Sequence, residues 1–104
     1  MATTSKALFR GAASTSSTTL YTVPTTSTTT VVTNVLVANT AGAAATFDLS
    51  IDSVQIANDV AVAANDTLSI DLKQVIPANA TPKTITGLAS AITVNFHISG
   101  VEIV

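Results

Sequence analysis

The chain has 104 residues, no Cys, a net charge of −2 and only 10% charged residues. Its length predicts one domain, and the lack of Cys excludes disulfides and thiolate metal sites. The few cations, at positions 6, 10, 73 and 83, cannot form the clustered basic surface that nucleic-acid binding requires.

Residues 1–17 are Thr, Ser and Ala around a small apolar group that contains Leu8 and Phe9. This composition cannot bury enough apolar surface to order itself, so we predict an N-terminal arm or a short edge strand. An ordered terminus needs a surface to lie on. A neighbouring chain would use Leu8 and Phe9 as anchors and place Arg10 on an acidic partner; the alternative is the chain's own sheet. In the first case, deleting residues 2–16 would leave the sandwich folded.

The next segments read as short strands separated by turns. A strand at Thr18–Val23 ends at Pro24, which cannot donate a ladder hydrogen bond. The Thr/Ser run at residues 25–30 is stiff and extended and leads into a longer strand over residues 28–38. Residues 39–42, Asn-Thr-Ala-Gly, form a turn.

Alternation of apolar and polar residues marks the middle of the chain. Residues 44–52 and 67–73 alternate cleanly, which is typical of half-buried strands. Between them we expect a turn at Asp52-Ser53, a return strand that begins at Val54, and an excursion of small residues over 58–66. A strand end at residues 75–77, a loop to residue 83 and a short strand at 84–88 follow.

The last stretch, residues 91–104, is the longest alternating segment and is expected at the centre of a sheet, because a long apolar edge invites aggregation. Gly100 interrupts its alternation, which predicts a bulge that returns Val101 and Ile103 to the core face. Seven or eight strands at such spacing predict an all-β, antiparallel β-sandwich of jelly-roll type over residues 18–104. The predicted core is Leu36, Phe47, Leu49, Ile51, Leu68, Ile70, Leu72, Val94, Phe96 and Ile98.

No catalytic or metal-binding motif is present. The single His, His97, has no accompanying nucleophile or second His in a recognisable pattern, so we expect a structural or interface role. Asp48 and Asp71 could meet across a sheet as a carboxylate pair or weak cation site, but the acids lack the spacing of a calcium loop. We therefore expect no enzyme, no cofactor and no metal, and the acids are interpreted as solubilising charge.

Neither a membrane partner nor a targeting segment is expected. No apolar run approaches the ~20 residues of a spanning helix, and residues 7–13 are too short, and interrupted by Arg10, for the core of a signal peptide. The scarce charge leaves a surface of Thr, Ser, Ala and Asn that repels neighbours weakly. Such a surface suits a protein packed in an assembly; a secreted or heat-resistant monomer is the alternative.

Several stretches resemble a family of small virion proteins of tailed bacteriophages. They are Leu20-Tyr21-Thr22-Val23-Pro24, the Thr/Ser run into residues 31–39, residues 63–68, and Gly100-Val101-Glu102-Ile103. The resemblance covers most of residues 18–104 and leaves residues 1–17 outside. It implies a β-sandwich without catalytic residues and a virion role, above all as a capsid decoration (cement) protein that forms trimers.

We therefore predict a structural protein on the outer capsid surface that bridges and stabilises neighbouring capsid subunits. Its expected partners are the major capsid protein and copies of itself, in a homotrimer, and its candidate partner-binding residues are Leu8, Phe9, Arg10 and Tyr21. The competing hypothesis is a tail-fibre or receptor-binding module that recognises host glycans. Sugar sites usually stack rings on aromatic side chains, and Tyr21 is the only amphipathic aromatic residue.

Overall fold

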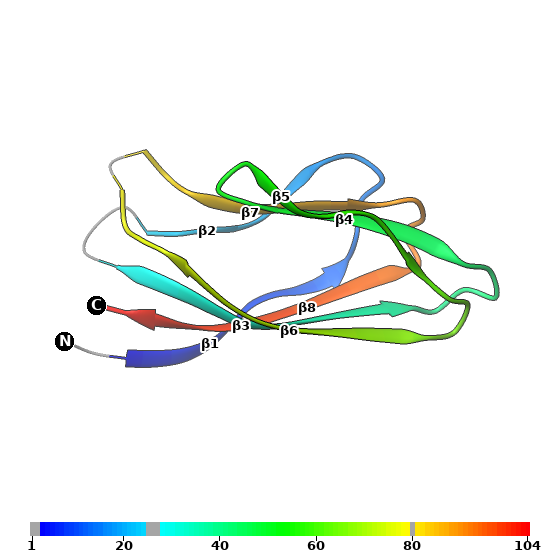
Figure 1. Ribbon diagram of the computed structural model, residues 1–104, viewed down its shortest axis with the longest axis horizontal. Helices are drawn as coiled ribbons and strands as arrows, with labels where there is room; N and C mark the ends of the chain where they lie inside the picture. The colour runs from blue at the N-terminus through cyan, green and yellow to red at the C-terminus, as the bar shows by residue number, and fades with distance from the viewer. Residues whose placement is uncertain (1–2, 25–27, 80) are drawn as a thin grey trace.

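The computed structural model describes residues 3–24, 28–79 and 81–104. These residues form eight strands in two four-stranded antiparallel sheets packed face to face, with Thr3 and Val104 at the same end of the sandwich (Figure 1). Sheet A has the order β1-β8-β3-β6, with β1 (Thr3–Ala12), β8 (Val94–Ile103), β3 (Thr29–Asn39) and β6 (Thr67–Ile76). Sheet B has the order β2-β7-β4-β5, with β2 (Thr18–Thr22), β7 (Thr84–Ala89), β4 (Ala45–Ile51) and β5 (Val54–Val62).

The connections alternate between the sheets. The chain passes from β1 in sheet A to β2 in sheet B and back to β3, and only β4 and β5 are consecutive in one sheet. This strand order is that of an eight-stranded jelly roll, in which two Greek keys close over one core. The predicted all-β antiparallel sandwich is confirmed. Among the described residues there is no helix of the length and apolar character that a membrane span requires.

The core lies between the inner faces of the two sheets. Phe47 of β4 and Phe96 of β8 are fully buried and meet edge to face, with ring centroids 5.9 Å apart. Six predicted core residues are buried, namely Phe47, Leu49, Ile51, Val94, Phe96 and Ile98. Three others, Leu68, Ile70 and Leu72, are partly buried and pack against this cluster. The prediction for Leu36 is wrong, because its side chain is 37% exposed.

Leu36 points outward because β3 contains a bulge. The register of β3 shifts between Val32 and Asn34 against both of its neighbours, and opposite β8 this shift leaves Thr33 as an extra residue. A bulge adds one residue to a strand and changes the phase of the alternation beyond it. Val32 is buried before the bulge and Val35 after it, so Leu36 falls on the outer face.

Gly100 is not the bulge that the sequence predicts. Strand β8 alternates without interruption, and Gly100 is buried in phase with Ile98 while Val101 stays on the outer face. The extra residues lie on the neighbouring strands instead, as Thr33 of β3 and Leu8 of β1. A Cβ at position 100 would lie 2.5 Å from the carbonyl oxygen of Val31 and 2.8 Å from Leu8 Cδ1. Gly100 therefore makes room for its bulged neighbours.

Replacement of Gly100 by Ala should destabilise the protein by about 1–3 kcal/mol, the usual cost of overpacking, because a backbone atom of β3 must move. Gly42, in the loop after β3, is a matched control: a Cβ there meets nothing within 4 Å. Gly42→Ala should be neutral or slightly stabilising, since it restricts the unfolded chain. Chemical denaturation of both variants measures this difference. Equal midpoints would show that β3 moves to admit a Cβ at position 100 without loss of stability.

Residues 3–12 form an edge strand of the chain's own sheet. Strand β1 pairs with β8 along its whole length, from Thr3 opposite Ile103 to Ala12 opposite Asn95. Of the two arrangements that the composition leaves open, the structure has the one in which this segment lies on its own sheet. Its order comes from the backbone ladder to β8 together with the burial of Leu8 in the core.

The described turns and loops follow the prediction with one exception. The turn after Asn39 and the two-residue turn at Asp52-Ser53 are confirmed, and both residues of the second have positive φ angles of 55° and 63°, as a tight hairpin turn requires. The expected excursion over residues 58–66 is wrong up to Val62, because β5 continues through these residues with a bulge at Asp59 (φ 50°). Residues 63–66 form the loop before β6. The extended run predicted for residues 25–30 lies partly outside the described residues.

Candidate interaction surfaces

The predicted partner-binding residues occupy different environments. Leu8 and Tyr21 are buried in this chain's own core, with 7% and 9% of their surface exposed. Phe9 is partly buried against that core at the free edge of β1, and Arg10 is exposed. Of the four residues, Phe9 and Arg10 are thus the ones whose side chains reach the surface. Contact of any of them with a partner stays a prediction.

A polar cluster closes the side of the sandwich between β1 and β2. The hydroxyl of Tyr21 donates a hydrogen bond to the carboxylate of Glu102 and lies 3.1 Å from Thr30 Oγ1. Lys6 Nζ lies 3.4 Å from Glu102 Oε1 and 5.9 Å from the centre of the Tyr21 ring. Tyr21 therefore presents no open ring face of the kind on which a sugar stacks, because the ring is covered by its own chain.

The cluster shifts the pKa values of Tyr21 and Glu102 in opposite directions. Burial, and then the hydrogen bond to Glu102, raise the pKa of Tyr21 to about 12. The hydrogen bond from Tyr21 is the main cause that lowers the pKa of Glu102, and Lys6 adds to it. At neutral pH the phenol is therefore a neutral donor and the carboxylate a charged acceptor, so the arrangement tethers β2 to β8.

Tyr21 should titrate near pH 12 instead of near its ordinary value of 10.0. A raised pKa means that the folded state holds the proton more tightly than the unfolded state. Its contribution to the free energy of unfolding is therefore complete below about pH 10 and is lost as the pH rises through about 12. Ultraviolet absorbance of the phenolate measures this cleanly, because the chain has one Tyr and no Trp.

The variant Glu102→Gln supplies the comparison for this titration. Removing the carboxylate should lower the pKa of Tyr21, yet leave it above the ordinary value, because burial is the larger cause. A native-state midpoint near pH 10 in the unmodified protein would show that the hydroxyl is open to water.

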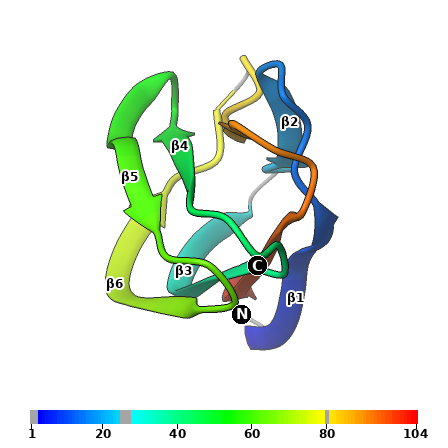
Figure 2. The ribbon, with the colours of Figure 1, turned by 90° about the vertical axis from the view of Figure 1, so that its right-hand side faces the viewer.

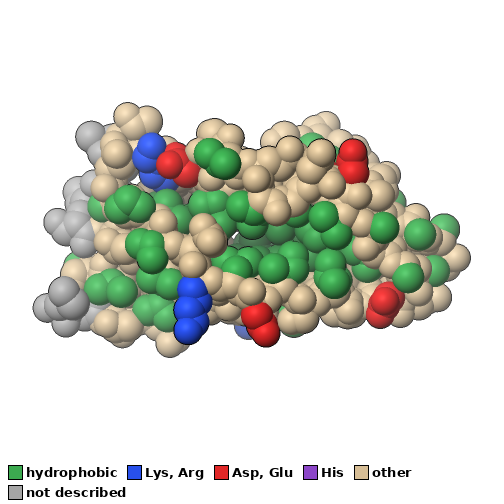
Figure 3. Space-filling view, viewed as in Figure 1, with side chains coloured by type: hydrophobic (Ala, Val, Ile, Leu, Met, Phe, Trp, Pro, Cys, Tyr) green, Lys and Arg blue, Asp and Glu red, His purple; other side chains and the backbone are tan. Residues whose placement is uncertain are grey.

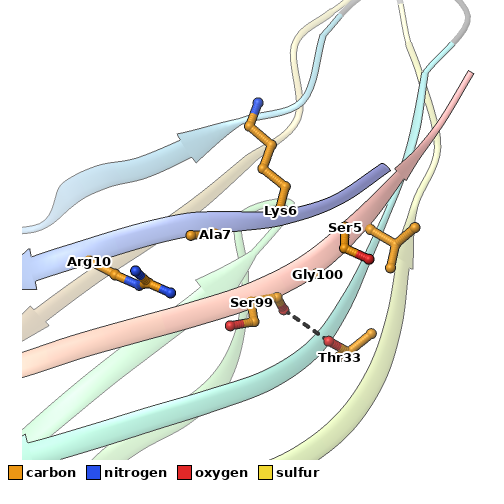
Figure 4. A pocket seen from close by; sticks show the side chains of 8 residues that line it. Ser5, Lys6, Ala7, Arg10, Thr33, Ser99 and Gly100 are labelled. Carbon is orange, nitrogen blue, oxygen red and sulfur yellow. Dashed lines mark hydrogen bonds between the residues drawn. The ribbon is translucent and has the colours of Figure 1, made fainter. Parts of the chain in front are cut away.

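The outer face of sheet A is hollowed along the row of bulges. A shallow pocket of about 350 Å³ lies beside β1 and is lined by Ala7, Arg10, Thr33 and Ser99, among others. Figure 4 shows the Arg10 side chain over this outer face, whereas Lys6 points away toward β2. The hydroxyl of Thr33 donates to the Ser99 carbonyl across the pocket floor at 3.3 Å. A pocket with one exposed cation above small polar groups is better suited to contact with another protein surface than to catalysis.

The same outer face carries an apolar row near the end where the chain termini lie. Val31 of β3 pairs with Val75 on one side and with Val101 on the other, so the three side chains are direct cross-strand neighbours. Val75 is 63% exposed, and Val31 and Val101 are partly exposed. The solvent face of an antiparallel sheet is ordinarily polar. This Val row, Val31, Val75 and Val101, is therefore a candidate contact surface.

The side of the sandwich between β5 and β6 is open. Apolar side chains follow the seam between the two sheets, with a hollow near its middle (Figure 3). A pocket of about 170 Å³ there is lined by Ile56 and Ala57 of β5 and by Ile70, Leu72 and Gln74 of β6. Ile56 is 43% exposed. The apolar core thus reaches the surface at this seam.

The remaining candidate residues lie apart. His97 is exposed on the outer face of sheet A, opposite Leu36 and Arg10. Asp48 and Asp71 do not meet, because they belong to different sheets. Asp48 accepts a hydrogen bond from the Asp59 backbone at 2.7 Å, and Asp71 accepts one from Asn34 at 3.2 Å. Within residues 3–24, 28–79 and 81–104, no group of three or more potential metal ligands comes together.

Sequence reasoning missed the Val row and the open seam. The alternation of single strands places Val101 on the core face and Ile70 and Leu72 in a closed core. Val101 stays on the outer face because β8 has no bulge at Gly100, and Ile70 and Leu72 reach the surface because β6 lies at the edge of its sheet. Neither is visible in the alternation of a single strand. Comparison of alternation between paired strands could have found the Val row once the pairing was known.

No protein-family model and no curated protein matches this sequence. Chains of two solved structures of infectious bursal disease virus match this chain. A chain from the crystal structure of the viral particle matches with a TM-score of 0.55 and 12% identity, over 97% of this chain and 30% of that chain. A chain from the structure of the Gx strain matches with a TM-score of 0.47 and 12% identity, over 96% and 28%. This chain spans less than a third of either matched chain, and the first likeness shows a shared fold alone.

Proposed function

We propose that this chain is a structural virion protein that decorates the outer capsid surface and bridges neighbouring subunits of the major capsid protein. The observation that carries this proposal is the Val row on the outer face of sheet A. An exposed apolar row on a mostly polar sheet face marks a surface that another protein covers. The broad face of the sandwich would lie on the shell through this row.

Two further features support a virion role. The jelly-roll fold is shared with a chain of a viral particle, and the sequence resembles small virion proteins of tailed bacteriophages. The charged fraction of 10% gives a surface that packs closely against neighbours with little repulsion. We include self-association, as a homotrimer, in the proposal.

The mechanism of stabilisation is mass action. A protein that binds the assembled shell and not the free subunits lowers the free energy of the shell. Contacts repeated by symmetry add avidity without requiring any single contact to be strong. A decoration protein therefore needs a flat, complementary face and no catalytic group.

The test is the variant Val75→Lys, measured by co-sedimentation with shells of the parent virus that lack the protein. Burying one Val is worth about 1.5–3 kcal/mol, so this change should weaken attachment at least tenfold, at about 1.4 kcal/mol per factor of ten. Val75 is 63% exposed, so the fold should be unaffected and the melting temperature unchanged.

Ile92→Lys is the matched control, because Ile92 is 69% exposed but lies in the loop before β8, off the Val row. It should bind shells as the unmodified protein does. Equal binding by both variants would contradict attachment through the outer face of sheet A. A particle reconstruction that places the chain on the tail would contradict the decoration role itself.

A further inference from the structure

The two sides of the sandwich are complementary in strand direction. Strands β1 and β2 form one side and β5 and β6 the other, as the end view shows (Figure 2). All neighbours within each sheet are antiparallel, and each sheet has four strands. Its two edge strands therefore run in opposite directions. A second copy in the same orientation would bring its β1 antiparallel to β6, and its β2 antiparallel to β5, so both sheets could continue across the contact.

The same geometry aligns an apolar group with the open seam. One row of paired residues crosses sheet A from edge to edge and runs Phe9–Ile98–Val35–Ile70. Phe9 is a partly buried side chain at the free edge of β1, and Ile70 lines the hollow between β5 and β6. If a neighbouring copy lies beside this one without a shift along the strands, the Phe9 side chain of that copy is therefore level with this apolar hollow.

The charges of the two sides are also complementary. The Arg10 side chain, on β1, has no hydrogen bond or ion pair within the described residues. On the opposite side, Asp66 accepts a hydrogen bond from its neighbour's backbone and Asp71 accepts one from Asn34, and the carboxylates of Asp59, Asp66 and Asp71 have no cationic partner among those residues. Arg10 pairs across its own sheet with His97, which is level with Leu36 and Ser69. A neighbour's Arg10 would thus lie beside Ser69, two residues from Asp71.

We propose that copies of this chain associate side by side, with the β1–β2 side of one copy docked on the β5–β6 side of the next. Phe9 enters the hollow lined by Ile56, Ile70 and Leu72, and Arg10 pairs with Asp71. The contact covers the exposed apolar seam and satisfies unpaired backbone groups of two edge strands, as in β-strand addition. The interface is heterologous, so it closes into a ring when the rotation between copies permits. It rests only on the self-association part of the proposed function.

The test is a charge exchange, followed by sedimentation of the purified full chain from micromolar to millimolar concentration. The unmodified protein should associate. Arg10→Glu and Asp71→Arg should each weaken association at least tenfold, because like charges then face each other in every contact. The variant that carries both substitutions should recover most of the loss, because opposite charges again face each other and the net charge is that of the unmodified protein. Phe9→Ala should weaken association by a similar factor.

Lys73→Glu is the matched control. It makes the same change of charge as Arg10→Glu and lies on another exposed edge strand, but on the acidic side of the proposed contact. Its association should be unchanged or stronger. A monomer at every concentration would overturn the proposal, as would single variants that associate normally or a double variant as weak as the single ones. Sedimentation of the free protein does not involve the shell, so loss of the decoration role would leave this result intact.

Discussion

A chain that lacks residues 1–12 should fail to reach the native sandwich. Strand β1 supplies the ladder along the whole of β8, and its Leu8 is buried in the core. Burying such a side chain contributes about 1.5–3 kcal/mol, and each ladder hydrogen bond contributes about 0.5–1.5 kcal/mol net. Together these terms approach the 5–15 kcal/mol that separates native from unfolded domains. The deletion also uncovers Ile98 and leaves β8, the central long strand, at an edge.

Circular dichroism and thermal unfolding measure this outcome. The truncated chain should show no cooperative transition, and a peptide of residues 1–17 added in excess should restore one by supplying the missing strand. Leu8→Ala in the full chain is the graded control, with an expected cost of about 2–5 kcal/mol. A truncated chain that unfolds cooperatively at the native midpoint would show that β1 is the dispensable arm that its composition suggests.

Alternation along single strands predicted most of the core. Phe47, Leu49 and Ile51 in β4, and Phe96 and Ile98 in β8, have the inward positions expected from a period of two. The chain alternates without interruption over these residues, so each residue keeps the face that the local pattern gives it. The all-β class and most turns followed from the same signals.

The errors share one cause. A bulge is defined by the pairing of two strands, so the pattern of one strand alone does not reveal it. The extra residues at Leu8 and Thr33 leave no mark in their own segments, and the nearest visible signal, Gly100, lies on the strand between them. The alternation therefore placed the irregularity at the correct position along the strands but on the wrong strand. Leu36 was misassigned for this reason.

The surfaces were harder to predict than the fold. Lys6, Tyr21 and Glu102 meet although 81 residues separate Tyr21 from Glu102, so only the tertiary fold brings them together. The scarcity of large apolar groups near the N-terminus and of cations in the chain marks Phe9 and Arg10 as candidates, and both side chains reach the surface of β1. Composition marked them, but their relation to Ile70 and Asp71 on the opposite side required the strand order.

Replacing Phe96 by Ala should be the most destabilising single change in the core. Phe96 is 0% exposed and packs edge to face on Phe47. Truncating a buried Phe costs about 3–5 kcal/mol, because the lost transfer energy adds to the cavity left behind. That is a large share of the stability of a domain of this size. Chemical denaturation at neutral pH measures the loss as a shift of the midpoint at constant slope.

The three Phe residues allow internal controls for this prediction. Phe9→Ala, at the partly buried edge position, should cost clearly less when measured on monomeric protein, because much of that side chain already contacts water. A double-mutant cycle of Phe47→Ala and Phe96→Ala should give a coupling energy of about 0.5–1.5 kcal/mol, the range for an edge-to-face ring pair. Equal losses in the free energy of unfolding for Phe96→Ala and Phe9→Ala would show that the inner face of β8 is not the centre of the core. The register of sheet A that places Phe9 level with Ile70 would then be wrong as well.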